Sequence, residues 1–311
     1  RARGQGRGGR DGDGGRAHVV GGYIVGKILG EGGFGQVRLG RHQITGEQVA
    51  LKFLNKTGMG STRAAQRVVT EIQCLVELNH PHVIKLLSVA NEPDYMVLIL
   101  EFAPHGDLRD YLCSKPEGRI DEAEASALFK QMLAAMAYAH KHHIVHRDLK
   151  LENMLLSETN SIKITDFGLS QFFKPGATYK TTAGSLNYLP PETLRGTSNE
   201  GPPVDVWALG VILFAMLFGY LPFEAAAGKD EDEAEDEIRA RIMRCDYRVP
   251  SDPRVSVEAK DLIRAMLQEN VEHRLSLPGV FGHPWVTAGA HTHHAHSPRD
   301  DEAGGGGGGG G

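Results

Sequence analysis

Apolar residues alternate with small residues from Tyr23 onward, and a short continuous apolar run follows at 96–102. The alternation that begins at Tyr23 enters a glycine-rich stretch at 30–35, and strand-like segments follow at 36–39 and 49–54. A period of two residues is typical of half-buried strands. The continuous apolar run at 96–102 leads into a Pro/Gly loop and predicts a buried strand. The pattern therefore predicts a sheet in the N-terminal third of the chain.

Four other segments are predicted to be helices. Apolar residues recur at helical spacing over 68–76 and 121–143, and 257–267 is predicted to be a further helix. In the long helix, Asp121 and Glu124 give a start similar to a capping box. The run at 206–218 is hydrophobic all round, which indicates a helix inside the core, and it is too short to span a bilayer. We therefore expect the C-terminal part to be mainly helical.

The strongest chemical signal lies between these two parts. Residues 146–153 read HRDLKLEN, and residues 166–168 read DFG. Asp148 is a candidate proton acceptor, and Lys150 can hold a moving phosphate. Asn153 and Asp166 offer the hard oxygen ligands that magnesium prefers. Each residue alone could be an ordinary polar loop residue, but the joint pattern suits phosphoryl transfer from a magnesium-bound nucleotide.

The glycine-rich stretch supports the same chemistry. Residues 30–37 read GEGGFGQV, and glycines allow backbone amides to approach phosphates closely. Dinucleotide-binding folds use the same glycine spacing, but there a helix follows at once, whereas here a strand follows. Lys52 lies in the next strand, within VALK. A lysine used to hold phosphates needs an acidic partner, and Glu71 in the helix predicted at 68–76 is the best candidate; the alternative is an exposed helix charge.

Taken together, these motifs resemble those of eukaryotic protein kinases over residues 23–285. Lys150, which follows Asp148-Leu149, is similar to the serine/threonine type. The stretch TTAGSLNY at 181–188 is similar to AMP-activated and sucrose-non-fermenting kinases, within the calmodulin-dependent kinase-like group. The resemblance implies an α+β, bilobal fold. It has a small, mostly antiparallel sheet lobe with one main helix (23–103), a larger helical lobe (104–285), and ATP between them.

The same resemblance assigns roles to individual residues. Asp148, Lys150 and Lys52 are the catalytic candidates, Glu71 orients Lys52, and Asn153 and Asp166 bind Mg²⁺. The positions expected around ATP are Leu29, Gly30, Glu31, Gly32, Gly33, Phe34, Gly35, Val37, Ala50, Lys52, Glu101, Ala103 and Asp107. Backbone groups of Glu101 and Ala103 would bind adenine, with Leu100 behind it. Asp107 would reach the ribose, cap the helix that starts at Leu108, or do both.

Residues 169–189 resemble an activation segment, in which an added phosphate orders a loop by pairing with arginine. The alignment places the activating phosphate on Thr181, with Arg147 as its partner, and lets Ser185 bridge Asp148 and Lys150. Glu192 would pair with Arg274, although two unpaired surface charges are the alternative. Where relatives have Ala before Pro-Glu, this chain has Pro190. The family role of Asp205 is to hold the backbone of the catalytic loop.

Composition narrows the class of protein. Hydrophobic residues make up 41% of the chain and charged residues 23%, as in soluble globular proteins. The net charge of −5 argues against nucleic acid as the main partner, and no signal peptide or membrane segment is predicted. Three widely spaced cysteines without a C-x-x-C motif fit a reducing compartment, so we expect a cytoplasmic location, with the nucleus as an alternative.

Several segments depart from the folded pattern. Residues 1–22 are rich in Arg and Gly, and 286–311 are His-rich, then acidic, then all Gly, so both are expected to be disordered. The first tail is either a solvated tail or an RNA contact. The acidic stretch 229–237 is either a solvated insertion or an attraction for basic substrates. His140, His142 and His143 end the long helix and are interpreted as structural rather than metal-binding.

The sequence thus predicts an ATP- and Mg²⁺-dependent kinase of protein serine and threonine, activated by an upstream kinase, with a protein substrate and no membrane partner. A catalytically silent pseudokinase scaffold is the alternative, although the catalytic residues named above are all present. Dual specificity for tyrosine is a lesser variant. The chain starts at Arg1 rather than Met, so it can be a fragment. Nothing in the sequence identifies the substrate, the activator or a regulatory subunit.

Overall fold

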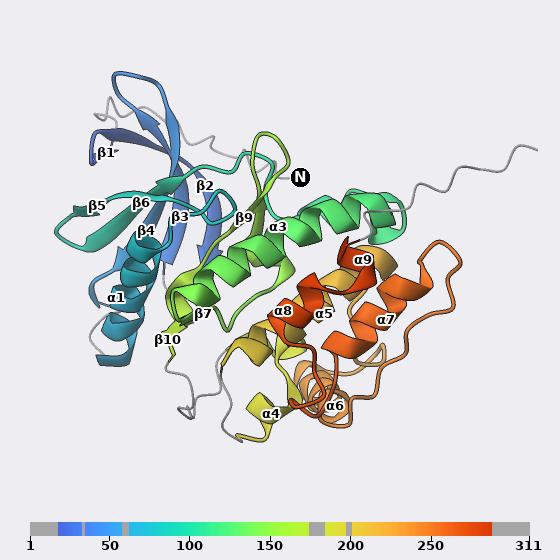
Figure 1. Ribbon diagram of the computed structural model, residues 1–311. Coiled ribbons are helices and arrows are strands. Elements are labelled where there is room, and N and C mark those ends of the chain that lie inside the picture. Colours follow the sequence, from blue (N-terminus) through green and yellow to red (C-terminus); the bar gives the residue numbers. More distant parts are fainter. Residues whose placement is uncertain (1–17, 33–34, 58–61, 174–183, 197–200, 288–311) are drawn as a thin grey trace, which may run out of the picture.

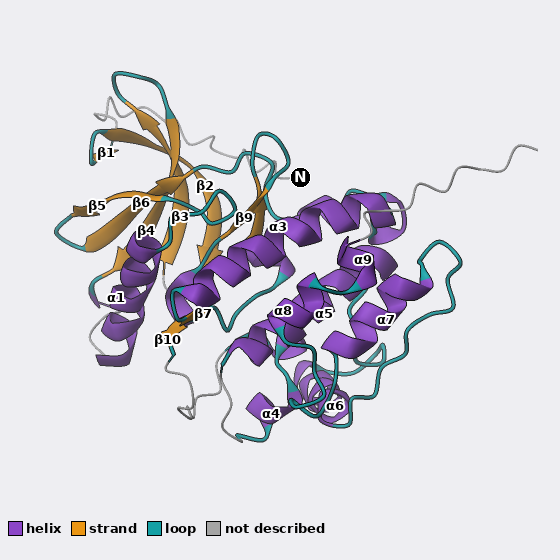
Figure 2. Ribbon diagram, in the orientation of Figure 1, coloured by secondary structure: helices purple, strands orange, loops and turns teal. Residues whose placement is uncertain are grey.

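The computed structural model describes residues 18–32, 35–57, 62–173, 184–196 and 201–287. A sheet with one helix forms the N-terminal part, and helices form most of the C-terminal part (Figures 1 and 2). This arrangement confirms the predicted α+β, two-lobed architecture. The expected disorder of the N-terminal tail, and the alternative that it contacts RNA, stay untested for residues 1–17, which lie outside the described residues, as do 288–311.

Six strands form the N-terminal sheet in the order β1-β2-β3-β4-β6-β5, and every neighbouring pair is antiparallel. The strands are β1 Val19–Val20, β2 Tyr23–Gly32, β3 Gly35–His42, β4 Gln48–Asn55, β5 Leu86–Asn91 and β6 Tyr95–Glu101. The helix of this lobe is α1, Thr62–Glu77. The period-two alternation places Leu98 and Leu100 in the main core and Val97 and Ile99 in a second cluster on the other sheet face.

The disorder expected for residues 1–22 was wrong for residues 18–22, which are ordered. Val19 pairs with Ile24, and Val20 pairs with Tyr23, so the chain is already part of the sheet before Tyr23. Val20 is completely buried in the second cluster, against Val49 and other strand residues. The Gly21-Gly22 turn, with φ of 57° and 89°, folds this short strand back onto β2. Burial of one valine thus orders a segment whose composition suggested a tail.

The C-terminal lobe is built on two buried helices. These are α3, Glu122–Lys141, and α5, Pro202–Phe218, in which every residue from Val204 to Phe218 is buried. Around them lie α2 Leu108–Cys113, α4 Pro191–Leu194, α6 Glu231–Met243, α7 Val257–Met266, α8 Leu277–Phe281 and α9 Pro284–Thr287. Two small antiparallel sheets complete the lobe: β7 Ile144–Val145 with β10 Gln171–Phe172, and β8 Met154–Leu156 with β9 Ile162–Ile164.

The ends of these helices follow from local chemistry. Asp121 is the N-cap of α3, and its Oδ1 accepts a hydrogen bond from Glu124 N at 2.8 Å. The helix ends two residues before the predicted His143, which has a φ of 60°. The acidic stretch at 229–237 starts α6: Asp230 caps the helix, and exposed acids fill its first turn, where they suit the helix dipole.

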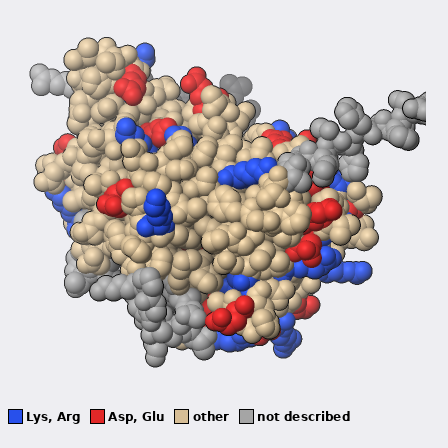
Figure 3. All heavy atoms as spheres, in the orientation of Figure 1, with Lys and Arg blue, Asp and Glu red and all other residues tan. Residues whose placement is uncertain are grey.

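The folded part also extends past the predicted end at 285. In α9, Trp285 donates its indole N–H to Glu122 Oε1 at 2.7 Å, and Val286 is buried. On the face shown in Figure 3, acidic and basic side chains are interspersed on a mostly uncharged surface. Within the described ranges, no helix has both the length and the apolar character needed to cross a membrane.

Candidate active site

A buried carboxylate holds the loop that carries Asp148. Asp205, in α5, has no solvent exposure and accepts hydrogen bonds from the backbone N–H groups of His146 at 3.0 Å and Arg147 at 2.9 Å. The His140 ring donates to the same carboxylate at 2.8 Å. Burial opposes ionisation of Asp205, but His140 and the backbone N–H groups outweigh it and hold the pKa of this carboxyl below its usual value. The expected role of Asp205 is confirmed.

The Asp148 carboxylate is fixed from several sides. Its Oδ1 accepts from Ser185 N at 2.9 Å and from Ser185 Oγ at 3.1 Å. Lys150 Nζ lies 3.2 Å from Asp148 Oδ2 and also donates to Ser185 Oγ at 3.0 Å. Asn153 donates its amide to the Asp148 backbone carbonyl at 2.7 Å. The predicted bridge through Ser185 is therefore confirmed, and Asp148 has one defined orientation.

Lys52 connects the two lobes. Its ammonium nitrogen lies 2.7 Å from Glu71 Oε1, in α1, and 2.9 Å from Asp166 Oδ1. Burial opposes the charged ammonium, but the two carboxylates outweigh this effect and raise the pKa of Lys52 above its usual value. Asp166 is likewise partly desolvated, yet Lys52 holds the pKa of Asp166 below its usual value. The expected Lys52–Glu71 ion pair is confirmed.

The local backbone explains how Asp166 reaches this position. Its φ of 66° lies in the left-handed region, and the turn of 3₁₀-helix at Phe167–Leu169 follows directly. The Phe167 side chain is fully buried, with its ring 4.7 Å from that of His146. Packing of Phe167 thus holds Asp166 toward Lys52.

The oxygen donors fit magnesium only together with a phosphate-bearing ligand. Asn153 uses its amide nitrogen on Asp148, which leaves its Oδ1 as the atom that can bind a cation, and Asp166 supplies a carboxylate. Among the described residues, no group of three or more His, Cys, Asp or Glu side chains could hold a metal. Magnesium is usually bound by one or two carboxylates together with phosphate oxygens and waters, so this small donor set suits it.

The histidines at the end of α3 have other partners. His140 bonds Asp205, and His142 Nδ1 lies 2.9 Å from Glu77 Oε1 at the end of α1. His143 packs edge-to-face on Phe173, with ring centroids 5.6 Å apart. These contacts support the structural interpretation of the three histidines.

The sheet brings the expected phosphate-binding residues into one row. Gly30 pairs with Val37, and Val37 pairs with Lys52, across β2, β3 and β4. At Gly35, a Cβ atom would lie 1.8 Å from the carbonyl oxygen of Phe53, so only glycine fits there. The exposed Leu29 and Glu31 lie in β2 beside this row, and Gly32 ends the strand. Gly33 and Phe34 lie outside the described residues.

The expected adenine site lies where β6 ends. Ala50 pairs with Leu100 across β4 and β6, and Leu100 is buried, so both lie in the sheet next to the connection between the lobes. Ala103 follows in this connection and is half-buried. Asp107 is the N-cap of α2, with its Oδ1 accepting from Asp110 N at 2.9 Å, and burial raises the pKa of this carboxyl. The capping role is confirmed, and the ribose contact stays a prediction.

Two partners of site residues were missed in the sequence. The Glu101 side chain binds Lys163 Nζ at 2.6 Å. The Arg147 guanidinium donates to the amide oxygen of Gln171, in β10. The only signal for Lys163 was its place between two apolar residues just before DFG, which is typical of a strand. Thr181 lies outside the described residues, so the activating phosphate on Thr181 and its pairing with Arg147 stay predictions.

The predicted pair beyond the activation segment is present. Arg274 binds Glu192 in a bidentate way, at 2.6 and 2.9 Å, and both side chains are buried. Pro190, where relatives have Ala, is the N-cap residue of α4 and has an extended backbone, so it leaves Glu192 in place in the first turn. The alternative of two unpaired surface charges was wrong.

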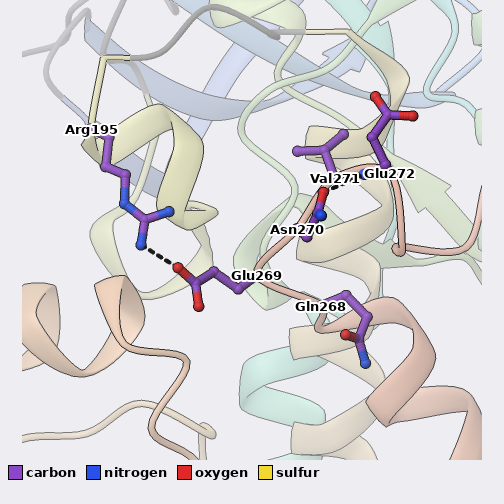
Figure 4. Close-up of a pocket in the computed structure, with 6 residues that line it drawn as sticks. All are labelled: Arg195, Gln268, Glu269, Asn270, Val271 and Glu272. Carbon is purple, nitrogen blue, oxygen red and sulfur yellow. Dashed lines mark hydrogen bonds and ion pairs between the residues drawn. The ribbon is translucent and has the colours of Figure 1, made fainter.

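Figure 4 shows a separate hollow of about 620 Å³. It is lined by Arg195 and residues 268–272, and Arg195 binds Glu269 Oε1 at 2.5 Å. One of its lining residues, Gln268, accepts hydrogen bonds from Arg274 at its backbone carbonyl. The lining of the hollow includes none of the residues expected to bind ATP or magnesium. We assign it no role in the chemistry at Asp148.

Comparison with known proteins agrees with this geometry. Residues 23–286 match the model of the protein kinase domain. The chain is 44% identical to the sucrose non-fermenting protein kinase 1 of Fusarium virguliforme over 268 residues, which are 86% of this chain and 37% of that protein. It is 41% identical to the human SNF-related serine/threonine-protein kinase over 269 residues, 86% of this chain and 34% of that protein.

A third relative is also named as a serine/threonine-protein kinase. The mouse serine/threonine-protein kinase SIK1 is 38% identical over 269 residues, 86% of this chain and 33% of that protein. The chain thus spans about a third of the length of the curated relatives that it matches. The resemblance to sucrose-non-fermenting kinases inferred from residues 181–188 is confirmed.

Proposed function

Because the chain belongs to the protein kinase domain family, we propose that it transfers the γ-phosphate of ATP to serine and threonine hydroxyls of proteins. The observation that carries this proposal is the position of Lys52, whose ammonium lies between Glu71 and Asp166 while Asp148 is held by Ser185 and Lys150. Such an arrangement is what phosphoryl transfer requires, because positioning and charge neutralisation supply most of the catalysis.

Each residue has a defined part in this reaction. Lys52 holds the α- and β-phosphates beneath the glycine-rich turn at 30–35. Asp166 and Asn153 Oδ1 would hold Mg²⁺, which would supply positive charge to neutralise the phosphates. Asp148 orients the substrate hydroxyl and takes its proton, and Lys150 stabilises the charge on the transferred group. Backbone groups of 101–103 bind adenine, Asp107 lies near the ribose, and Leu29, Val37 and Ala50 line the ATP site.

We further propose activation by an upstream kinase at Thr181. Arg147 is buried, lies next to Asp148 in the chain, and donates to the neutral amide of Gln171. A dianionic phosphate on Thr181 would be a stronger partner for the Arg147 guanidinium and would draw it away from Gln171. The similarity of residues 181–188 to the relatives supports this assignment. Thr181→Ala is expected to lower activity strongly, and a fully active variant would reject it.

The test is phosphate transfer from radiolabelled ATP to a positional library of Ser, Thr and Tyr peptides. The wild type, treated with an activating kinase, should label Ser and Thr peptides, and phosphoamino-acid analysis would detect any tyrosine. Asp148→Asn should lower transfer at least about 100-fold while keeping the circular dichroism spectrum. Absence of transfer even with Thr181 phosphorylated would favour the scaffold alternative. The library also identifies the sequence that the site prefers.

A further inference from the structure

The Glu101 carboxylate joins three segments of the chain. Its Oε1 lies 2.6 Å from Lys163 Nζ, and its Oε2 accepts from the backbone N–H of Lys85 at 3.3 Å. The Glu101 backbone N–H donates to the Lys85 carbonyl at 2.9 Å. Glu101 is the last residue of β6, Lys85 precedes β5, and Lys163 is the middle residue of β9. One side chain thus binds the sheet of the first lobe to a strand of the second.

Strand β9 is also bound to the first lobe through its backbone. Ile164 N donates to His82 O at 2.8 Å, and Ile84 N donates to Ile164 O at 2.9 Å. The ring Nδ1–H of His82 donates to the Ile162 carbonyl at 3.1 Å. Ile162 and Ile164 are fully buried, so Lys163 points to the opposite side of the strand, toward Glu101.

Because of the position of β9, the Lys163–Glu101 ion pair lies between two parts of the expected ATP site. Asp166, which binds Lys52, follows Lys163 by three residues, and the backbone that would bind adenine begins at Glu101. The pair therefore connects the base-binding end of the ATP site to its phosphate-binding end. The Lys163 and Glu101 side chains are 15% and 32% exposed, so solvent screens the pair less than it screens most surface pairs.

We propose that Lys163 is a positioning residue for ATP, which acts through Glu101 on the backbone at 101–103. This inference rests on the proposed function. The ion pair coexists with the Lys52–Glu71 and Lys52–Asp166 contacts, so it supports the arrangement needed for catalysis rather than opposing it. Its loss should weaken ATP binding while leaving the groups around Asp148 in place.

The test compares Lys163→Met with the wild type in steady-state kinetics and in calorimetric titration with Mg-ATP. We expect the KM and Kd for ATP to rise about fivefold, with kcat at saturating ATP within about twofold. Lys163→Arg should bind Mg-ATP with an affinity close to that of the wild type. The double variant Lys163→Glu/Glu101→Lys, which exchanges the two charges, should do the same. Lys85→Met is the matched control, because this lysine is exposed and only its backbone contacts Glu101.

The outcomes separate the two proposals. Unchanged KM and Kd in Lys163→Met, or a raised kcat, would overturn the positioning role while leaving the kinase assignment intact. A wild type that binds ATP but transfers no phosphate would reject the proposed function. In that case the Kd values for Mg-ATP of the wild type and the Lys163 variants would still decide the role of Lys163. A wild type that binds no ATP would reject both.

Discussion

Asp205 shows what one buried carboxylate can do at the scale of a single residue. Arg147, next to Asp148, has a φ of 69°, a conformation that costs free energy for a residue with a side chain. The hydrogen bonds from the N–H groups of His146 and Arg147 to Asp205 compensate for that cost. The placement of the proton acceptor thus depends on a residue 57 positions later in the chain.

The substitution Asp205→Asn should therefore destabilise the fold in a pH-dependent way. At pH 7 we expect a loss of roughly 3 kcal/mol in the free energy of unfolding, because charged acceptors make stronger bonds. The pKa of Asp205 is lower in the folded state than its ordinary 3.8, so the unfolded chain binds the proton more readily. The wild-type carboxylate contribution is complete above that value and is lost as the pH falls through the depressed pKa.

Denaturant unfolding at pH 7 and at stepwise lower pH checks this prediction. The difference between wild type and Asp205→Asn should shrink below pH 3.8. Asp246→Asn, which changes a side chain that is 69% exposed, is the control and should have little effect. A difference of the same size at every pH would contradict the argument.

Ser185 acts on the same loop from the opposite side. Its hydroxyl donates to Asp148 Oδ1 and accepts from Lys150. Ser185→Ala removes both bonds and should lower kcat by about tenfold or more, with the KM for ATP nearly unchanged. Ser185→Thr keeps the hydroxyl and should retain most of the activity. Equal kcat in the Ala and Thr variants would show that the hydroxyl has no such role.

At the scale of elements, burial rather than composition decides what is ordered. Strand β1 has only two residues, and its neighbours are mostly glycine and polar residues. It nevertheless belongs to the sheet, because Val20 fills a place beside Val49, Leu51 and Ile99. By contrast, Val19 on the opposite side is 38% exposed.

This difference between adjacent valines gives a direct test. Val20→Ala should lower the free energy of unfolding by about 2 kcal/mol, since it leaves a cavity in the second cluster. Val19→Ala removes the same atoms from an exposed position and should change stability by less than about 0.5 kcal/mol. Chemical denaturation of the two variants measures both values. Similar effects of the two substitutions would mean that β1 does not contribute to the core.

At the scale of the whole molecule, ion pairs join segments that are far apart in sequence. Arg274 binds Glu192, stacks on Trp207 with 5.0 Å to the ring centroid, and donates to the carbonyls of Pro203 and Gln268. These contacts connect α4, the start of α5 and the loop after α7. The end of the activation segment is thereby attached to the core of the larger lobe.

Because Arg274 is buried, its ion pair with Glu192 is expected to contribute strongly to the free energy of unfolding. Arg274→Gln should lower the free energy of unfolding by roughly 3–5 kcal/mol, because a buried carboxylate loses its guanidinium partner. Arg254→Gln removes an arginine that also binds a glutamate in a bidentate way, but both side chains are at least 60% exposed. We expect a loss of at most about 1 kcal/mol there. Thermal and denaturant unfolding compare the two, and equal losses would contradict the argument from burial.

The sequence by itself determined the main strands of the N-terminal sheet, the four helices predicted at 68–76, 121–143, 206–218 and 257–267, and most of the candidate chemistry. Hydrophobic period locates the strands and helices, because the side-chain directions of both follow directly from local backbone geometry. Asp148, Asn153 and Asp166 lie within 19 residues of one another, in two neighbouring motifs, HRDLKLEN and DFG. Lys52 and Glu71 required a resemblance as well, since an exposed and a paired lysine look identical in a sequence.

Only the tertiary structure decided which charges are buried and which residues meet across the lobes. Lys163 and Glu101 are 62 positions apart, and neither lies in a pattern that distinguishes them from surface charges. Val20 lies in a glycine-rich segment, and its burial depends on strands that come 29 or more residues later. The burial of a side chain depends on residues that are distant in the sequence, because these residues together exclude water from it. Local sequence patterns therefore do not reveal such contacts.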